Sequence, residues 1–301
     1  MTAVFYQVLV LFAFAALGFL LAKRKMLNTQ HTPILSVFLV NIFLPFNAFR
    51  TFCLNFNREY ICANYTLMLW SVAIILPLTV LMTFISKFFA KRKYEQSIYE
   101  YSLIIPNYGY MGYPMAEAVL GPIGLLNAMM FGFPISFYTY TVGYCKLSKR
   151  DICVKKLINP VLIAMLFGAL AGLFRIKMPV VVISVLEKAS ACMGPVSMLL
   201  AGVVISEFDL KELFFMKKVY IVTALRLIVI PVIIGLLLRP FSRIAMETAL
   251  LIYAMPCGLN TIVFPRLVGE DCRIGAGLAL VSNILACVTI PLVLALFSIG
   301  G

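Results

Sequence analysis

Long apolar runs, separated by short and mostly basic connections, make up nearly the whole sequence. A helix needs about 20 apolar residues to cross the hydrocarbon core of a bilayer, and most of the runs reach this length. We therefore predict an all-α polytopic membrane protein. Its ten transmembrane helices are expected at residues 3–22, 34–50, 65–88, 96–120, 123–145, 157–174, 179–206, 219–238, 244–265 and 274–299.

Composition excludes a soluble protein. The chain of 301 residues is 63% hydrophobic with a mean hydropathy of +1.02, and only 12% of its residues are charged. A soluble domain carries roughly twice that charged share. The formal net charge of +13 comes from basic groups spread over many connections. The expected partner is therefore the lipid bilayer, and no nucleic acid is expected.

The basic residues also set the expected orientation. The odd-numbered connections hold 17 Lys and Arg residues, whereas the even-numbered connections hold six. Lys and Arg accumulate in cytoplasmic connections, so we place the odd-numbered connections in the cytoplasm. Both termini are then expected outside, in a multi-pass protein of the plasma membrane.

Proline spacing suggests that the chain contains two related halves. Pro45 and Pro195 lie 150 residues apart, and Pro106 and Pro256 show the same offset. Five helices per half is an odd number, so the second half is expected to be inverted relative to the first. Inverted repeats are a feature of secondary transporters. The predicted repeats are residues 1–150 and 151–301.

The fourth and ninth predicted helices each contain two prolines and at least one glycine at membrane depth. We predict that the segments from Pro106 to Pro114 and from Pro256 to Pro265 are unwound, because proline removes a backbone donor and clashes with the preceding turn. Unwound backbone inside a membrane must face protein or a water-filled cavity. The two broken helices are therefore expected to cross at the midplane, beside a cavity.

Each second half-helix begins at its break, so two positive helix ends are expected to converge. This arrangement favours an anion, most simply a carboxylate. Asn107 and Asn260 supply amide donors that could complete its coordination. Each asparagine could also simply cap its half-helix, and the two roles can coexist.

Four segments carry a resemblance to a known family. They are NYGYMGYP (107–114), MPCGLNTIVFP (255–265), GPVSMLLAGVVIS (194–206) and NIFLPFNAF (41–49). The first is similar to the N-x-G-x-x-G-x-P crossover of the auxin efflux carrier family, which includes bacterial organic-acid permeases, and the second resembles that family's other crossover.

The resemblance implies ten helices in two inverted repeats, with helices 1, 2, 6 and 7 as scaffold. Helices 3–5 and 8–10 would carry the substrate by an elevator-like step, in a homodimer. Plant members have a long cytoplasmic loop and an N-P-N crossover, whereas this chain has a short loop and Asn-Tyr-Gly, so a microbial carboxylate carrier fits better than an auxin carrier. The candidate substrate-binding residues are Asn107, Tyr108, Gly109, Gly112, Pro114, Arg226, Gly258, Asn260 and Thr261.

Three of the charged residues inside the predicted helices are candidates for a functional role. Arg226 is expected to be a carboxylate clamp, an ion-pair partner of Glu117 or a structural partner of a helix end, because an arginine at membrane depth needs compensation. Glu117 either caps its half-helix or carries a coupling proton. Glu100 is a weaker proton candidate, since snorkelling to the interface would explain it.

The leading hypothesis is a secondary active carrier of a small organic anion, such as a dicarboxylate or an auxin-like acid, with a proton or sodium ion as a candidate coupling ion. The alternatives are a sodium-coupled organic-anion symporter of the bile-acid carrier type and an anion channel. No enzyme activity, cofactor or metal site is expected, because the three aspartates and the only histidine, His31, lie in connections. The sequence does not decide whether Cys53 and Cys62 form a disulfide.

Overall fold

The computed structural model describes residues 2–27, 31–149 and 160–299. The described chain is helical throughout, apart from its connections and one isolated β-bridge. It contains seven helices that are long and apolar enough to cross a membrane. The expectation of an all-α polytopic membrane protein is confirmed at this level, and the count of ten stays a prediction.

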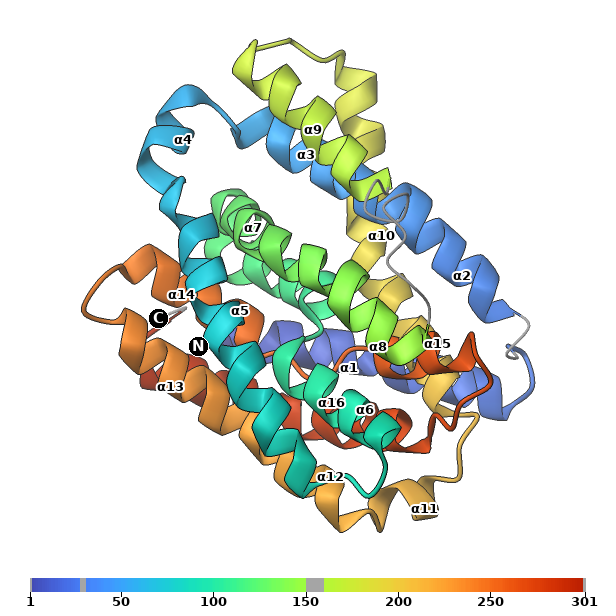
Figure 1. Cartoon of the computed structure of the whole chain (residues 1–301). Coiled ribbons are helices and arrows are strands. Elements are labelled where there is room, and N and C mark those ends of the chain that lie inside the picture. The colour runs from blue at the N-terminus through green and yellow to red at the C-terminus, as the bar shows by residue number, and fades with distance from the viewer. Residues whose placement is uncertain (1, 28–30, 150–159, 300–301) are drawn as a thin grey trace.

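The first half begins with a single long helix and continues with helices that are interrupted by short π- or 3₁₀-helical turns (Figure 1). Its elements are α1 (Thr2–Lys23), α2 (Thr32–Phe38), η2 (Leu39–Phe43), α3 (Leu44–Asn55), α4 (Arg58–Asn64), α5 (Thr66–Ile85), η3 (Ser86–Phe88), α6 (Lys93–Ile104), η4 (Tyr108–Gly112), α7 (Tyr113–Tyr138), η5 (Thr139–Gly143) and α8 (Tyr144–Ser148).

The second half has the same character, and residues 157–159 of its first predicted helix lie outside the described part. Its elements are α9 (Pro160–Leu173), α10 (Val180–Ile205), α11 (Leu210–Phe214), α12 (Lys217–Ala224), η7 (Leu225–Val229), α13 (Ile230–Leu238), α14 (Arg243–Tyr253), α15 (Asn260–Arg266) and α16 (Arg273–Leu296).

Prolines account for three of the four π-helical turns in the described residues. The turns η2, η4 and η7 each end two residues before a proline, at Pro45, Pro114 and Pro231. In each case the N–H just before the proline donates to the carbonyl five residues back, as from Tyr113 to Tyr108. This wider turn lets the chain continue as a helix past a residue that cannot donate.

Gly121 divides α7 into two helices. Its φ of 71° and ψ of −168° are open only to glycine, and Pro122 follows it directly. The break separates the short helix Tyr113–Leu120 from the long one that ends at Tyr138. It coincides with the predicted boundary between the fourth and fifth spans.

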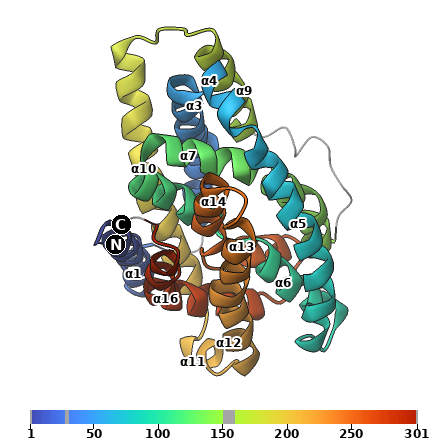
Figure 2. The same ribbon diagram turned by 90° about the vertical axis from the view of Figure 1, so that its left-hand side faces the viewer.

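Close helix packing in one group of helices depends on glycines. Helix α1 runs along α10, and α3 runs along α9 (Figure 2). A Cβ on Gly202 would stand 1.9 Å from the carbonyl oxygen of Ala15, and one on Gly172 would stand 2.4 Å from that of Phe56. Gly168 and Gly172 form a G-x-x-x-G face, which is typical of helix pairs in membranes.

The most deeply buried elements are the ends of α6 and α14 and the segments that follow them. Leu103, Ile104, Tyr253 and Met255 are fully buried, whereas α5 and α13 present large apolar side chains on the outside. Exposed apolar surface of this extent fits contact with lipid. Both views place the two ends of the chain on the same side, where α1 packs on α16.

The contact at Gly202 generates a stability prediction. Gly202→Ala should lower the free energy of unfolding by about 1–3 kcal/mol, because α1 and α10 must separate to admit the methyl group. The matched control is Gly109→Ala, where a Cβ meets nothing within 4 Å. Melting temperature in detergent measures both variants, and an equal effect of the two substitutions would contradict the packing argument.

Candidate functional site

Two interruptions of the helical backbone meet near the centre of the molecule. Helix α6 ends at Ile104 and the chain resumes as η4 at Tyr108, while α14 ends at Tyr253 and the chain resumes as α15 at Asn260. Between them, Pro106 and Cys257 form an antiparallel β-bridge, and the Asn107 N–H donates to the Pro256 carbonyl oxygen at 2.8 Å. The two predicted breaks therefore meet, and we call this region the crossover.

The interruptions are shorter than the proline pattern predicts, and the expectation that 106–114 and 256–265 are unwound throughout is wrong. Only residues 105–107 and 254–259 leave the helical path. Pro114 follows the π-turn η4, and the Tyr110 carbonyl that it leaves unbonded accepts a hydrogen bond from the Ser197 hydroxyl at 3.0 Å. Pro265 lies in the last turn of α15, where the helix ends in any case.

Side-chain and backbone groups nearby form hydrogen bonds with the non-helical backbone. The Cys257 N–H donates to Ser282 Oγ of α16 at 3.0 Å, and the N–H groups of Met111 and Gly112 both donate to the Asn107 carbonyl oxygen. Backbone that leaves a helix inside a membrane needs such partners. The crossover is thus stabilised by contacts from α16 and α10 as well as by its own bridge.

A cavity of about 90 Å³ lies against the crossover. Five tyrosines and both asparagines line it, and its opposite wall comes from α3 and the first turns of α9. No Lys, Arg, His, Asp or Glu is among its described lining residues. They are Leu44, Tyr101, Ile105, Pro106, Asn107, Tyr108, Gly109, Tyr110, Tyr113, Met129, Phe133, Ser136, Tyr140, Val161, Leu162, Met165, Gly258, Leu259 and Asn260.

Five of the nine predicted substrate-binding residues line this cavity, namely Asn107, Tyr108, Gly109, Gly258 and Asn260. The other four lie outside it. Gly112 packs toward Met255, the Thr261 hydroxyl bonds the Gly258 carbonyl oxygen at 2.9 Å, and Pro114 lines a second cavity together with Glu117. Arg226 contacts the end of α6 and does not reach the cavity. The crossover prolines Pro256 and Pro265 do not line the cavity either.

Neither asparagine side chain caps its half-helix, so the capping alternative is not observed. The N-cap of α15 is Leu259 without a side-chain bond, and Asn107 at the start of η4 makes no cap bond. Asn260 instead donates from Nδ2 to the Tyr101 hydroxyl at 2.9 Å. No hydrogen bond to another described residue involves the amide of the Asn107 side chain, and it borders the cavity. Tyr108 bonds Ser136 at 2.8 Å.

The carboxylate of Glu117 pairs with Arg50 and not with Arg226. The Arg50 Nη1 lies 3.1 Å from Glu117 Oε1, and its Nη2 lies 3.7 Å from Glu187 Oε1 of α10. The predicted pairing of Arg226 with Glu117 is therefore wrong. Arg50 was missed because it follows an apolar run and counts among the basic residues of a connection. Its partner stands 67 residues away in the sequence.

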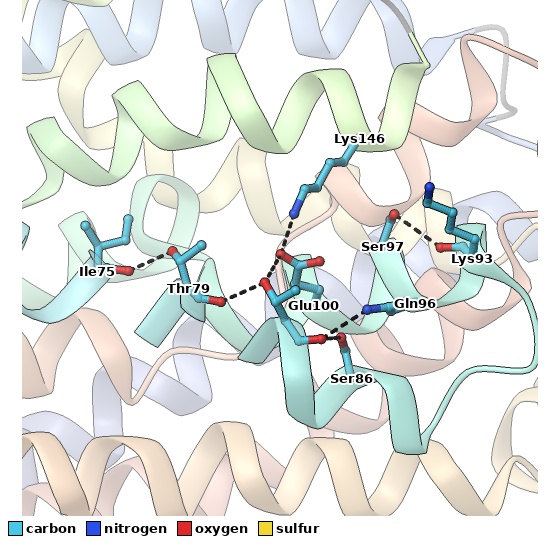
Figure 3. A network of polar contacts seen from close by, with 9 residues as sticks. Ile75, Thr79, Ser86, Lys93, Gln96, Ser97, Glu100 and Lys146 are labelled. Atoms are coloured by element: carbon cyan, nitrogen blue, oxygen red, sulfur yellow. Dashed lines mark hydrogen bonds and ion pairs between the residues drawn. The ribbon is translucent and has the colours of Figure 1, made fainter. Parts of the chain in front are cut away.

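Glu100 is buried and ion-paired, which excludes the snorkelling explanation. Its residue is only 3% exposed, the Lys146 Nζ lies 2.6 Å from Oε1, and the Thr83 hydroxyl donates to the same oxygen at 2.8 Å. Figure 3 shows the side chains of Glu100 and Lys146 pointing toward one another, from α6 and α8. The pair joins α5, α6 and α8, and it does not line the cavity.

The second half contains a pair related to that of Arg50. Arg266 at the end of α15 contacts Glu207, just after α10, with Nη2 to Oε2 at 2.6 Å. Nearby, Arg273 bonds Asp271 in the connection before α16 at 2.6 Å, and this hydrogen bond holds the pKa of the Asp271 carboxyl below its usual value. The pair of Arg266 joins α15 to the end of α10, and a contact of Arg273 with Glu212 joins α16 to α11.

Cys53 and Cys62 are both free thiols, the first buried in α3 and the second exposed on α4. The disulfide that the sequence left open is not formed.

Comparison with known proteins gives one positive result. A family profile described as "Membrane transport protein" matches residues 3–151 and again residues 147–294, which together cover nearly the whole chain. A search of curated proteins finds no match.

The Arg50–Glu117 contact generates a prediction on stability. Arg50→Gln should destabilise the protein because it leaves Glu117 and Glu187 without their cation. The double variant Arg50→Gln/Glu117→Gln should recover part of the loss. A double-mutant cycle on melting temperature measures the coupling. Additive effects of the two substitutions would show that the contact contributes nothing.

Proposed function

The chain belongs to the membrane transport protein family, the family of the auxin efflux carriers, and on this basis we propose that it is a secondary active carrier of a small organic anion. The observation that supports this most directly is the cavity at the crossover. Its polar groups are amides and hydroxyls supplied by both breaks and by the helices that flank them.

Donors without a fixed acceptor support the binding of an anion. The Asn107 amide borders the cavity and has no hydrogen-bond partner among the described residues, and the η4 N-terminus begins beside it. Tyrosine hydroxyls and carboxamides bind a carboxylate without a full positive charge. The second half-helix, α15, has only seven residues, so its dipole contributes less than the sequence interpretation assumed.

The neutral lining favours one negative charge on the substrate over two. A second carboxylate would enter a wall of tyrosine, Phe133, Leu44 and the apolar residues of α9, where no cationic side chain among the described lining residues compensates it. Aromatic rings instead suit a planar or apolar substrate body. We therefore propose a monocarboxylate in preference to the dicarboxylates that the sequence left open.

The grouping of the helices supports the proposed elevator step. Helices α1, α3, α9 and α10 pack on one another, and the wall of the cavity that α3 and α9 supply belongs to this scaffold group. The crossover belongs to the group of α5–α8 and α12–α16. Displacement of the second group along the first would carry the anion between the two sides of the membrane. We retain ten transmembrane helices, two inverted repeats and a homodimer as parts of the proposal.

Glu117 is the proposed coupling residue, in preference to Glu100. Its partner Arg50 belongs to the scaffold group, so the proposed displacement would separate the pair. The partner of Glu100, Lys146, lies in the same group as Glu100 and would move with it. Proton coupling and sodium coupling are distinguished by uptake into proteoliposomes in sodium-free buffer. Saturable uptake with counterflow distinguishes the carrier from the channel.

The proposed site predicts the effect of removing its amides. Asn107→Ala and Asn260→Ala should each weaken monocarboxylate binding by about 1–3 kcal/mol, the usual loss for a buried charge-assisted contact. A thermal-shift panel of mono- and dicarboxylates on the purified protein identifies the ligand and measures the change. Asn41→Ala is the control, because Asn41 bonds only its own helix on an exposed face. Unchanged affinity in both crossover variants would remove the asparagines from the site.

The proposed orientation predicts which connections are accessible from outside. In a cysteine-free variant, a single cysteine at Arg92, before α6, should be protected from membrane-impermeant thiol reagents in intact cells. A cysteine at Phe241, in the exposed connection between α13 and α14, should be labelled. The opposite result would place both termini in the cytoplasm.

A further inference from the structure

Arg226 is a fully buried arginine without a carboxylate partner. Its residue is 0% exposed, and no Asp or Glu of the described chain forms an ion pair with it. Its Nε and Nη2 donors have no hydrogen-bond partner among the described residues. A buried guanidinium without compensation is expensive inside a membrane, so the charge needs an explanation that the substrate cavity does not provide.

Two contacts of Arg226 are with residues at the ends of half-helices. Its Nη1 lies 3.5 Å from the carbonyl oxygen of Leu103, in the last turn of α6, and its guanidinium carbon lies 5.5 Å from the ring centre of Tyr253, the last residue of α14. These are the two helices that run into the crossover. Each helix C-terminus carries about half a negative elementary charge, so together they balance about one positive charge.

The backbone around Arg226 places it at this point. Arg226 lies in the π-turn η7, which precedes Pro231 and displaces the chain from a regular α-helix. The guanidinium thereby reaches the carbonyl side of the crossover, while the asparagines and the start of η4 face the cavity on the amide side. The negative helix ends thus lie on the side of the crossover that Arg226 contacts, and the donors lie on the side that faces the cavity.

We propose that the Arg226 guanidinium is the fixed cation of the crossover, which neutralises the C-terminal ends of α6 and α14 and holds them together. In carriers with discontinuous helices, such carbonyl ends coordinate a bound Na⁺ or H⁺. Here a side chain of the protein supplies the charge, and no dissociable cation is needed at this position. Arg226 is then a positioning residue that never touches the substrate. The inference rests on the proposed carrier function only in placing the crossover inside a membrane.

Charge and packing are separated by two substitutions in the purified full-length protein. Arg226→Lys keeps the charge, and its melting temperature should stay close to that of the wild type. Arg226→Met keeps the side-chain length without the charge, and its melting temperature should be lower by at least about 5 °C. Arg239→Met, on an exposed arginine at the end of α13, controls for loss of an arginine elsewhere. Equal effects of Lys and Met, or a Met variant as stable as wild type, would overturn the proposal, since burial of a needless charge is often destabilising.

A third variant tests the cation directly. Arg226→Ala should regain stability with millimolar methylguanidinium and not with the same concentration of tetramethylammonium, which is too large and lacks donors. Absence of guanidinium rescue would overturn the assignment of Arg226 as the cation of this site.

A local measurement covers the case in which a variant folds poorly. Cys257 forms the β-bridge of the crossover and is fully buried. With the other cysteines replaced, alkylation of Cys257 should be faster in Arg226→Met than in wild type and unchanged in Arg226→Lys. Equal rates in all three proteins would overturn the proposal. None of these measurements needs a substrate, so failure here is distinct from failure of the proposed transport of an anion.

Discussion

The contact between the two helix breaks is the constraint on which the rest of the structure depends. Two polypeptide segments without helical hydrogen bonds meet inside an apolar protein. Their backbone N–H and carbonyl groups therefore need hydrogen-bond partners from the protein. The bond from the Asn107 N–H to the Pro256 carbonyl oxygen lets each break satisfy the other. Two serines of neighbouring helices add hydrogen bonds: Ser282 accepts from the Cys257 N–H, and Ser197 donates to the Tyr110 carbonyl oxygen. Residues of both breaks line the same cavity.

Charge is separated from the cavity by the same arrangement. The described residues that line the cavity are uncharged, and the ion pairs of Arg50 with Glu117 and of Lys146 with Glu100 lie outside it. Arg226 sits on the opposite side of the crossover, against the helix C-terminal ends. The proposed substrate anion would therefore meet amides and hydroxyls, which can bind it reversibly. A full counter-charge in the lining would hold the anion more tightly and oppose its release.

The sequence predicts the helical membrane architecture, the two breaks and five of the residues that line the cavity, because proline and glycine act locally and their effects can be read from position alone. It does not predict the extent of the breaks, since the π-turn before Pro114 lets the helix continue. Nor does it predict that Tyr101 meets Asn260, or Arg50 meets Glu117, because the partners are far apart in sequence. Long-range contacts of this kind depend on how the helices pack, and the spacing of residues along the sequence does not predict them.

Two of the Arg–Glu pairs, Arg50 with Glu117 and Arg266 with Glu207, fit the proposal that the halves are related. Glu117 and Arg266 both follow a break, and they lie 149 residues apart, one short of the 150-residue offset of the prolines. Glu117 pairs with Arg50 in α3, and Arg266 pairs with Glu207 just after α10, so the charges are exchanged between the two pairs. In the proposed inverted arrangement the pairs stand on opposite sides of the membrane. The proposed displacement of one helix group along the other would therefore have to break contacts of both pairs, which favours the conformation in which both are closed.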